Sequence, residues 1–595
     1  MTAAELRARG NAALAQGKVD EARQLYQQAA AADPKDAVPW LNLGFVNVET
    51  GRWAEARDSL ARAIALSRSG DDFLPDAHYL RGRAHQELGA VQPALDDFQA
   101  AAAARPGFAE PMESAAQLLL FAGRYGDALD WARRSAKARP NPQMDLVAAQ
   151  ALDKLDRPAE ALVLLDGLVR EDPGSAMALE GQGNMRLRLD RAADALAAFE
   201  RATSLEETAT RQSNVALALH RLGRSGDAVA RMQRALEIDS GQRNDAYNLS
   251  AVLLEMLQPA GAAEILERAM RANPGDANLG WSLAVAQLLR GELIKGFAAF
   301  EHRFLCDALP WRKPAPDFGR PRWTGRETLG GRTILLFAEQ GLGDSIQMLR
   351  YLPRVAAQAH KVWIQLPRAL APLATSLPRN LSVLTEAEPP PRTDFQCPLM
   401  SLPLAFGTTL STIPAAIPYL EADPSRTAAW RKRLDSLGRG PRVGLVWSGN
   451  AAHANDRNRS IPLASFRAIA APGVQFVSLQ PEVRPGDRAA YDAWTGLARF
   501  GEELHDFSDT AALVAALDLV IAVDTSVAHL AGAMGCPTWI LLPHYPDWRW
   551  LLDRADSPWY PTARLWRQPR PRDWAPVLGA VRGELERVKG IEPSS

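Results

Sequence analysis

The sequence is poor in cysteine, and its three cysteines, Cys306, Cys397 and Cys536, are far apart and form no Cys-x-x-Cys motif. This spacing gives no disulfide framework, and it predicts buried thiols in a reducing compartment. No apolar run approaches the roughly 20 residues that a membrane span needs. The first residues, MTAAELRARGNAALAQG, contain no apolar segment typical of a secretory signal. We therefore expect a cytoplasmic protein with no integral membrane segment.

An excess of charge of one sign is also absent. The 68 lysines and arginines nearly balance the 69 aspartates and glutamates, and the formal net charge is −1. This balance gives no reason to expect nucleic acid or an anionic membrane as a partner. No cluster of histidines or carboxylates has metal-ligand spacing, and no Asp-x-Asp motif ends a predicted strand, so we expect no metal site and no cofactor.

The first half of the chain contains an internal repeat. A small residue recurs at intervals of 33 or 34 residues, with one interval of 38. A proline follows most of these residues by twelve positions, a larger apolar residue follows by four, and a glycine often precedes by twelve. The recurring small residues are Ala22, Ala56, Ala94, Ala128, Ala161, Ala195, Ala228 and Ala262.

This spacing predicts pairs of helices of about 12–14 residues, in which a small residue lets two backbones approach and proline stops the second helix. The pattern resembles the tetratricopeptide repeat, most closely in AVPWLNLGFVNVETGRWAEARDSLARAIAL, which carries Trp40, Leu43, Gly44, Ala56 and Ala63. The resemblance implies a curved superhelix whose groove holds an extended peptide. The alternative is that the repeats only act as a spacer.

A ninth unit, ANLGWSLAVAQLLRGELIKGFAAFEHRF, has Gly296 in place of the alanine and lacks the proline. We expect it to cap the stack or to dock onto the next domain. The proline- and glycine-rich segment that follows, from Cys306 to Arg332, predicts an extended connector.

After this connector, short β-rich runs alternate with helical stretches, which predicts parallel sheets covered on both faces. Two such blocks in succession predict two Rossmann-like domains that face a cleft. The eight predicted strands are 332–339, 361–367, 381–386, 395–400, 442–449, 474–480, 518–524 and 538–543. The predicted domains are a repeat superhelix at 1–305, a linker at 306–331, and Rossmann-like domains at 332–439 and 440–595.

Ligands of open α/β sheets bind at the carboxyl ends of the strands, and the first such end reads FAEQGLGDSIQMLRYL. It is not a dinucleotide fingerprint, because Ile346 stands where the third glycine is needed, and no Gly-Lys-Ser/Thr of a P-loop follows. Two glycines, Gly341 and Gly343, would let a ligand approach the backbone closely beside Gln340. Asp344 would project into the cleft, or it would simply cap the helix.

The second strand end is WSGNAAHANDRNRSIPL. Ser448 and Asn450 end the strand, and the polar loop behind them carries Arg457 and Arg459. Arginine can hold phosphate through two parallel hydrogen bonds, so either arginine is a candidate for a phosphate-bearing ligand. Solvated loop arginines are the alternative.

The third strand end is VDTSVAHLAGAMGCP. Asp524 ends the strand, and Thr525 or Ser526 would cap the next helix and present its free amides to an anion. His529 lies one turn further on the same side. A histidine that only packs in the core is the alternative.

The fourth strand end is HYPDWRWLLDRADSPWYPTARLWRQ, where Arg549 stands between Trp548 and Trp550. These aromatic rings would stack a nucleobase or sugar, or most of the segment would pack the edge of the domain.

Residues 331–580 resemble the bacterial heptosyltransferase-like glycosyltransferases of family 9, in the subgroup that is fused to tetratricopeptide repeats. The matching blocks occur in order along the chain and are EQGLGDSIQMLRYLP, GLVWSGN…NDRNRSIPL, LDLVIAVDTSVAHLAGAMGCPTWILLP and DWRW…SPWYPTARLWRQ.

The resemblance implies a GT-B fold and a sugar transfer that needs no metal. It implies that Asp344 is the general base and that Asp524, Thr525 and His529 bind the donor. Ser526 departs from the glycine that is frequent in the family, and Arg459 or Arg457 stands in for the lysine that binds the donor phosphate. Because of these departures, ADP-heptose is not carried over as the donor.

We therefore expect a glycosyltransferase that moves a sugar from a nucleotide-sugar donor to an acceptor, which would be a protein recruited by the repeats. One alternative is an inactive repeat scaffold that only binds partner proteins. The other is a transferase that acts on a lipid or polysaccharide, in which the repeats serve only assembly.

Overall fold

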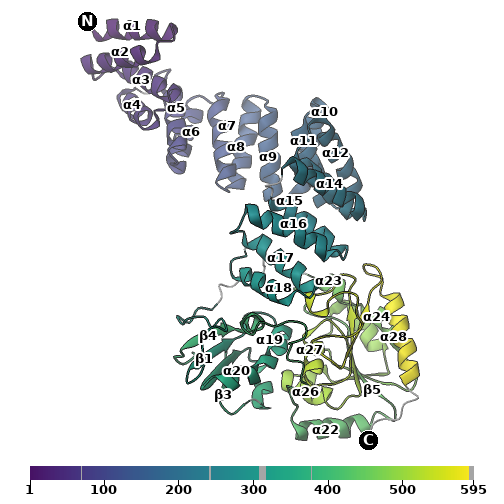
Figure 1. Cartoon of the computed structure of the whole chain (residues 1–595). Helices are drawn as coiled ribbons and strands as arrows, with labels where there is room; N and C mark the ends of the chain where they lie inside the picture. The colour runs from purple at the N-terminus through teal and green to yellow at the C-terminus, as the bar shows by residue number, and fades with distance from the viewer. Residues whose placement is uncertain (69, 240–242, 307–315, 377, 454, 589–595) are drawn as a thin grey trace. The chain divides into compact units, whose positions relative to one another are not determined.

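The computed structural model describes residues 1–68, 70–239, 243–306, 316–376, 378–453 and 455–588. The chain forms two compact units, residues 1–238 and residues 239–595. A helical solenoid is followed by an α/β region with two parallel sheets, which confirms the predicted fold class (Figure 1). Residues 307–315 of the predicted linker lie outside the described residues, and the predicted domain boundaries stay predictions.

The solenoid consists of helix pairs in which nearly every helix has 13 or 14 residues. The first unit contains α1 (Ala3–Ala15), α2 (Val19–Ala32), α3 (Ala37–Glu49), α4 (Trp53–Leu66), α5 (Leu74–Glu87), α6 (Val91–Ala104), α7 (Ala109–Phe121), α8 (Tyr125–Ala138), α9 (Pro142–Lys154), α10 (Pro158–Glu171), α11 (Ala176–Arg188), α12 (Ala192–Leu205), α13 (Ala209–Arg221) and α14 (Ser225–Ile238). The second unit begins with α15 (Arg243–Glu255), α16 (Pro259–Ala272), α17 (Ala277–Leu289), α18 (Leu293–Phe300) and η1 (Glu301–Phe304).

Close packing within each pair depends on the small residues that the sequence singled out. A Cβ on Gly183 would lie 2.4 Å from the Phe199 ring, and one on Gly44 would lie 2.4 Å from the Leu60 side chain. Glycine on one helix therefore leaves a space, and the larger side chain of the partner helix fills it. Each recurring proline lies two residues after a helix end, as Pro34 does after α2.

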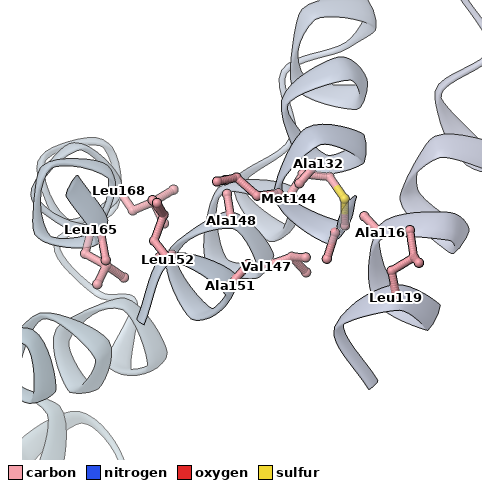
Figure 2. Packing of buried hydrophobic residues seen from close by; sticks show 14 of the residues in the cluster. Ala116, Leu119, Ala132, Met144, Val147, Ala148, Ala151, Leu152, Leu165 and Leu168 are labelled. Atoms are coloured by element: carbon pink, nitrogen blue, oxygen red, sulfur yellow. The ribbon is translucent and has the colours of Figure 1, made fainter. Parts of the chain in front are cut away.

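The core of the solenoid continues from one pair to the next. In Figure 2, Met144 and Val147 of α9 point toward α7 and α8, whereas Leu152 points toward Leu168 of α10. Each helix pair buries its apolar face against its neighbours, so the repeats stabilise one another.

The first sheet contains four parallel strands in the order β3-β2-β1-β4. The register pairs Thr333 with Lys361 and Ile334 with Phe395. Sheet order reverses between β1 and β4, which makes this the topological switch point. The strands are β1 (Thr333–Phe337), β2 (Lys361–Leu366), β3 (Leu381–Thr385) and β4 (Phe395–Pro398).

The second sheet contains six parallel strands in the order β10-β9-β8-β5-β6-β7, which is the doubly wound order 3-2-1-4-5-6 when read from its other edge. Its switch point lies between β5 and β8, where Val446 pairs with Ala522. The strands are β5 (Arg442–Val446), β6 (Gln475–Ser478), β7 (Leu497–Arg499), β8 (Leu519–Val523), β9 (Thr538–Leu542) and β10 (Ala563–Arg567).

Short helices connect these strands. In the first block they are α19 (Leu342–Met348), η2 (Leu349–Tyr351), α20 (Leu352–Gln358), η3 (Ala371–Ser376), η4 (Leu399–Ser401), α21 (Leu402–Ala405) and α22 (Pro424–Asp435). In the second block they are α23 (Asp456–Arg459), α24 (Leu463–Phe466), η5 (Arg467–Ile469), η6 (Pro485–Asp487), α25 (Arg488–Ala493), η7 (Gly501–Glu503), α26 (Phe507–Val514), α27 (Ser526–Ala533), η8 (Trp548–Trp550) and α28 (Ala575–Val588).

The ninth repeat docks onto the α/β region and does not merely cap the stack. The Phe297 ring of α18 lies edge-on to Trp548, with the two centroids 5.4 Å apart. Arg303 of η1 donates a hydrogen bond to Glu339 at the end of β1, with a distance of 3.0 Å. The last repeat therefore contacts loops that follow strands of both sheets.

All eight predicted strands are present, each shorter than predicted by one to three residues. Two strands were missed. β7 has only three residues. β10 lies within the tryptophan- and arginine-rich segment, where the sequence shows no plain apolar run that would predict a strand. Cys306 and Cys397 are buried as predicted, but Cys536 is only partly buried.

Candidate functional site

The switch point of the second sheet leaves two buried hydroxyl groups unsatisfied. Ser448 follows β5 and is 3% exposed, and Thr525 follows the neighbouring β8. Neither Ser448 Oγ nor Thr525 Oγ1 has a hydrogen-bond partner among the described residues. A buried polar atom without a partner is costly, so a polar ligand at this strand end would satisfy both hydroxyl groups.

The expected cap of α27 is absent. Thr525 occupies the N-cap position in an extended conformation, but its side chain makes no capping hydrogen bond. Ser526 is the first residue of the helix and is partly buried. The prediction of a side-chain cap by Thr525 is therefore wrong, and its hydroxyl stays available.

Arg459 lies against the same strand end. Its NH1 group donates to the backbone carbonyl oxygen of Asp524 at 3.0 Å. Its buried Nε has no hydrogen-bond partner in the described part of the chain, although it lies 3.7 Å from Asp456 Oδ1 in an ion pair. Gly449 makes room for it, because a Cβ there would lie 2.6 Å from Arg459 NH2. Arg457, in contrast, is exposed, as is Asn450, whose side chain accepts from the Ala452 amide in a local turn.

Asp524 and His529 face each other at the start of α27. His529 Nε2 lies 3.9 Å from Asp524 Oδ1, and His529 Nδ1 lies 2.8 Å from the Tyr560 hydroxyl oxygen. The imidazole also stacks on Trp550, with ring centroids 5.3 Å apart. This packing fixes the orientation of the histidine ring.

Burial shifts the pKa values of this pair in opposite directions. Burial, with a contribution from the nearby Asp547 carboxylate, raises the pKa of Asp524 to about 6. Burial and the positive charges of Arg549, Arg350 and Arg459 lower the pKa of His529 well below its ordinary value. His529 is therefore neutral near pH 7 and acts as a hydrogen-bonding group rather than a cation.

The glycine turn of the first sheet lies directly against this pair. A Cβ on Gly343 would lie 2.8 Å from His529 Cδ2, so glycine is needed for the close approach of α19 to α27. Neither Gly341 nor Gly343 has the positive φ that would require glycine for conformational reasons. Gln340 is partly exposed beside the turn.

Asp344 is the third residue of α19 and not its N-cap. Its Oδ2 accepts a hydrogen bond of 2.8 Å from the Gly341 amide, and its Oδ1 forms an ion pair with Arg549. The carboxylate is 23% exposed. It therefore both closes the first turn of the helix and faces the second sheet.

Arg549 is the residue of this site that the sequence did not assign. It lies in η8 after β9, and it donates to Gln347 Oε1 at 2.6 Å and to Asp547 Oδ1 at 2.8 Å. The only sign of it in the sequence is the Trp-Arg-Trp run, which predicts either stacking of a nucleobase or sugar or packing at the edge of the domain. The ion pair with Asp344 joins residues 205 positions apart, and no local pattern predicts such a contact.

Glu339, at the end of β1, is a second carboxylate near Asp344. It accepts from Arg303 and, at 3.3 Å, from the Met400 amide, whereas its Oε2 is buried without a partner among the described residues. Burial raises the pKa of Glu339 to about 7; Arg303 opposes this shift and Asp344 adds to it. The two carboxylates near the end of β1 thus differ in burial and in hydrogen bonding.

Among the described residues, no group of three or more His, Cys, Asp or Glu side chains is arranged to hold a metal ion. No helix in the described ranges is long and apolar enough to cross a membrane.

Tetratricopeptide repeats in the helical part of this chain precede a two-sheet α/β region. Sequence models of the tetratricopeptide repeat match residues 13–84 and 146–214. Protein FlbA of Caulobacter vibrioides is 26% identical over 435 residues, which cover 68% of this chain and 72% of FlbA.

Several solved structures of repeat proteins are similar to part of this chain. The C-terminal part of a repeat protein from Cytophaga hutchinsonii is 11% identical, with a TM-score of 0.36, over 40% of this chain and 98% of its own. A tetratricopeptide repeat protein from Parabacteroides merdae is 18% identical, with a TM-score of 0.31, over 42% and 98%. YrrB, described as a TPR protein with an unusual peptide-binding site, is 18% identical, with a TM-score of 0.29, over 33% and 97%.

Proposed function

We propose that the chain is a glycosyltransferase that moves a sugar from a nucleotide-sugar donor to a protein recruited by its repeats. One observation carries this proposal. At the switch point of the second sheet, two buried hydroxyls and the Nε of Arg459 have no hydrogen-bond partner among the described residues, and Gly343 brings the Asp344 turn of the first sheet against α27.

The unsatisfied groups have the chemistry that a diphosphate needs. Ser448 and Thr525 would donate from their hydroxyls, and Arg459 would donate from Nε with its positive charge. The amides of Ser526 and Val527 in the first turn of α27 would add backbone donors at the same end of β8, whereas the Ala528 amide already donates to the Thr525 carbonyl oxygen at 3.0 Å. Together these donors would stabilise the negative charge that develops on a nucleoside diphosphate as it leaves.

The transfer then balances as a single displacement. The acceptor hydroxyl oxygen forms a bond to the anomeric carbon of the sugar. The bond from that carbon to the β-phosphate oxygen breaks, and its electron pair leaves with the nucleoside diphosphate. The proton of the acceptor hydroxyl goes to the Asp344 carboxylate, which acts as the general base. The neutral His529 would remain a fixed hydrogen-bonding neighbour of the donor.

The proposed protein acceptor rests on the repeats. Stacked tetratricopeptide units present extended surfaces that are used to hold peptide segments, and the ninth unit contacts Trp548 and Glu339 beside the site. A peptide held along the repeats of the second unit would thus lie near the loops that carry the chemistry.

A thermal-shift panel on the full chain tests the proposal. UDP-, GDP-, dTDP- and ADP-sugars are compared, because a ligand that binds only the native state raises its melting temperature by mass action. The correct donor is expected to raise it by several degrees in wild type, since binding at 100 times Kd adds about 2.7 kcal/mol. Arg459→Gln is expected to lose most of this rise.

Arg457→Gln is the matched control, because it removes the same charge two residues away from an exposed side chain. It is expected to keep the wild-type response. If no nucleotide sugar shifts wild type at millimolar concentration, the chain does not bind such donors, and a scaffold function is favoured. If a donor does bind, the intact masses of co-expressed candidate proteins test whether a protein is the acceptor.

A further inference from the structure

Arg549 lies in η8, which follows a strand of the second sheet. Two of its three guanidinium nitrogens nevertheless contact α19, the helix that follows β1 of the first sheet. Its Nε donates to Gln347 Oε1, and its NH2 group pairs with Asp344 Oδ1. Asp344 and Gln347 are three residues apart on α19, so they lie on the same helix face. One planar fork therefore binds both polar side chains of that face.

The guanidinium is itself held in place. Its NH1 group donates to Asp547 Oδ1 at 2.8 Å, and its Cζ lies 4.2 Å from the centre of the Trp548 ring. The side chain is 7% exposed, and each of its three nitrogens has an acceptor. A buried arginine with an acceptor at each of its three nitrogens has little freedom to turn.

Trp548 extends this support to the last repeat. Its ring lies edge-on to Phe297 and Phe300 of α18, with centroid distances of 5.4 and 6.3 Å. Trp548, which precedes Arg549 in the chain, thus packs against the ninth tetratricopeptide unit. These contacts all lie within the second compact unit.

The consequence for Asp344 is a carboxylate fixed from two sides. Arg549 binds Oδ1, and the Gly341 amide binds Oδ2. A carboxylate offers about four lone-pair positions, so both oxygens keep one free position for a further proton donor. The plane of the carboxylate is set by groups from both sheets.

We propose that Arg549 is a positioning residue, which holds the Asp344 carboxylate in the orientation that receives the proton of the acceptor hydroxyl. This inference rests on the proposed function. It makes catalysis depend on the contact between η8 and α19, and not on the donor-binding groups alone.

The test is a double-mutant cycle on the full chain. Release of nucleoside diphosphate from each of the four nucleotide sugars, with water or a protein acceptor, is measured for wild type, Arg549→Gln, Asp344→Asn and the double variant. Arg549→Gln is expected to lower kcat about 100-fold, as expected for a misplaced catalytic group, and to leave KM for the nucleotide sugar unchanged.

If Arg549 acts only through Asp344, its substitution has no further effect in the Asp344→Asn background. Arg549→Lys is expected to recover part of kcat, because it keeps the charge but lacks the planar fork. Arg554→Gln is the matched control, because Arg554 pairs with Asp556 within its own loop; it is expected to behave as wild type.

Additive losses in the cycle, or a rise in KM with kcat unchanged, would overturn the positioning role while leaving the transferase intact. If Arg549→Gln fails to fold, Gln347→Met replaces it in the cycle, since it removes the acceptor of Arg549 Nε and keeps the side-chain size. If wild type neither binds nor cleaves any of the four sugars, the proposed function fails and the positioning role fails with it.

Discussion

Two buried carboxylates, one in each compact unit, have pKa values that are shifted in opposite directions. Asp97 in the repeats and Glu339 in the α/β region have side chains that are only 4% and 6% exposed. Burial alone would raise the pKa of both. At Asp97, hydrogen bonds from His78 and Arg81 outweigh burial and lower the pKa. At Glu339, burial prevails and raises the pKa to about 7.

The number of hydrogen bonds explains the difference. Asp97 Oδ1 lies 2.6 Å from Arg81 NH2 and 2.9 Å from His78 Nδ1, and its Oδ2 accepts from Arg81 Nε at 2.8 Å. Both donors lie on α5, the partner helix of the same repeat. Among the described residues, Glu339 has hydrogen-bond donors on one of its two oxygens only. The contrast is specific to these two carboxylates, because buried polar atoms without a hydrogen-bond partner occur in the described repeats as well, for example Asn47 Oδ1 and Ser135 Oγ.

The largest expected effect is in the repeats, with Asp97→Asn. This change removes the charge that Arg81 and His78 surround, and breaking a buried ion pair costs about 3–5 kcal/mol. The melting transition of the first unit is expected to fall accordingly in calorimetry of the full chain. Because the pKa of Asp97 is lowered, its stabilising contribution is present above pH 3.8 and is lost as pH falls further.

Asp96→Asn is the control for this variant, since Asp96 is exposed on the same helix and accepts a hydrogen bond from the exposed Gln92. It is expected to leave the transition in place. Equal losses in the two variants would show that the local hydrogen bonds of Asp97 do not stabilise the repeats.

A smaller effect is expected from adding one methyl group at each of two close approaches. In Gly183→Ala the new Cβ would meet the fully buried Phe199 ring at 2.4 Å, and overpacking of this kind costs about 1–3 kcal/mol. In Gly343→Ala it would meet His529 Cδ2 at 2.8 Å. Gly183→Ala is expected to lower only the transition of the first unit. Gly343→Ala is expected to weaken nucleotide-sugar binding in the thermal-shift panel.

The two substitutions also separate the units. If Gly183→Ala weakens binding as strongly as Gly343→Ala does, the glycine at the α19–α27 contact has no special relation to the site. Melting and binding measured on the same samples decide this.

The sequence predicts the repeats well because their contacts are local and recur. The spacing of Ala161 and Leu165, or of Gly183 and Phe199, is repeated along the chain, so several registers agree on one structure. The strands are predicted for a similar reason, since each is a short apolar run bounded by polar residues. The missed strand β7 is too short to carry such a pattern.

The candidate site is less predictable because its contacts join distant segments. The strand-end rule brings Ser448 and Thr525 together, as their neighbouring strands require. It does not predict that Arg549 binds Asp344, or that Arg303 from the last repeat binds Glu339. These pairs depend on how two sheets and a helix pair are packed, and that information is not present in any single stretch of sequence.

The last prediction concerns the pH dependence of stability, which Glu339→Gln is expected to change only within one pH window. The pKa of Glu339 rises from an ordinary value of 4.5 to about 7 on folding, so the folded state binds a proton that the unfolded state has lost. The contribution of Glu339 to stability is therefore complete below pH 4.5 and is lost as pH rises through 7. Relative to Glu339→Gln, wild type is expected to lose up to about 1.4 kcal/mol per pH unit within this window.

The exposed Glu421 provides the control, because Glu421→Gln removes one carboxylate from the same unit without touching the buried network. Subtracting each variant from wild type cancels the titration of Asp524 and His529, whose shifts have opposite signs. Parallel pH profiles for wild type and Glu339→Gln would mean that Glu339 stays ionised beside Arg303. The comparison with Asp97 would then fail, since both carboxylates would behave as fully satisfied ion-pair partners.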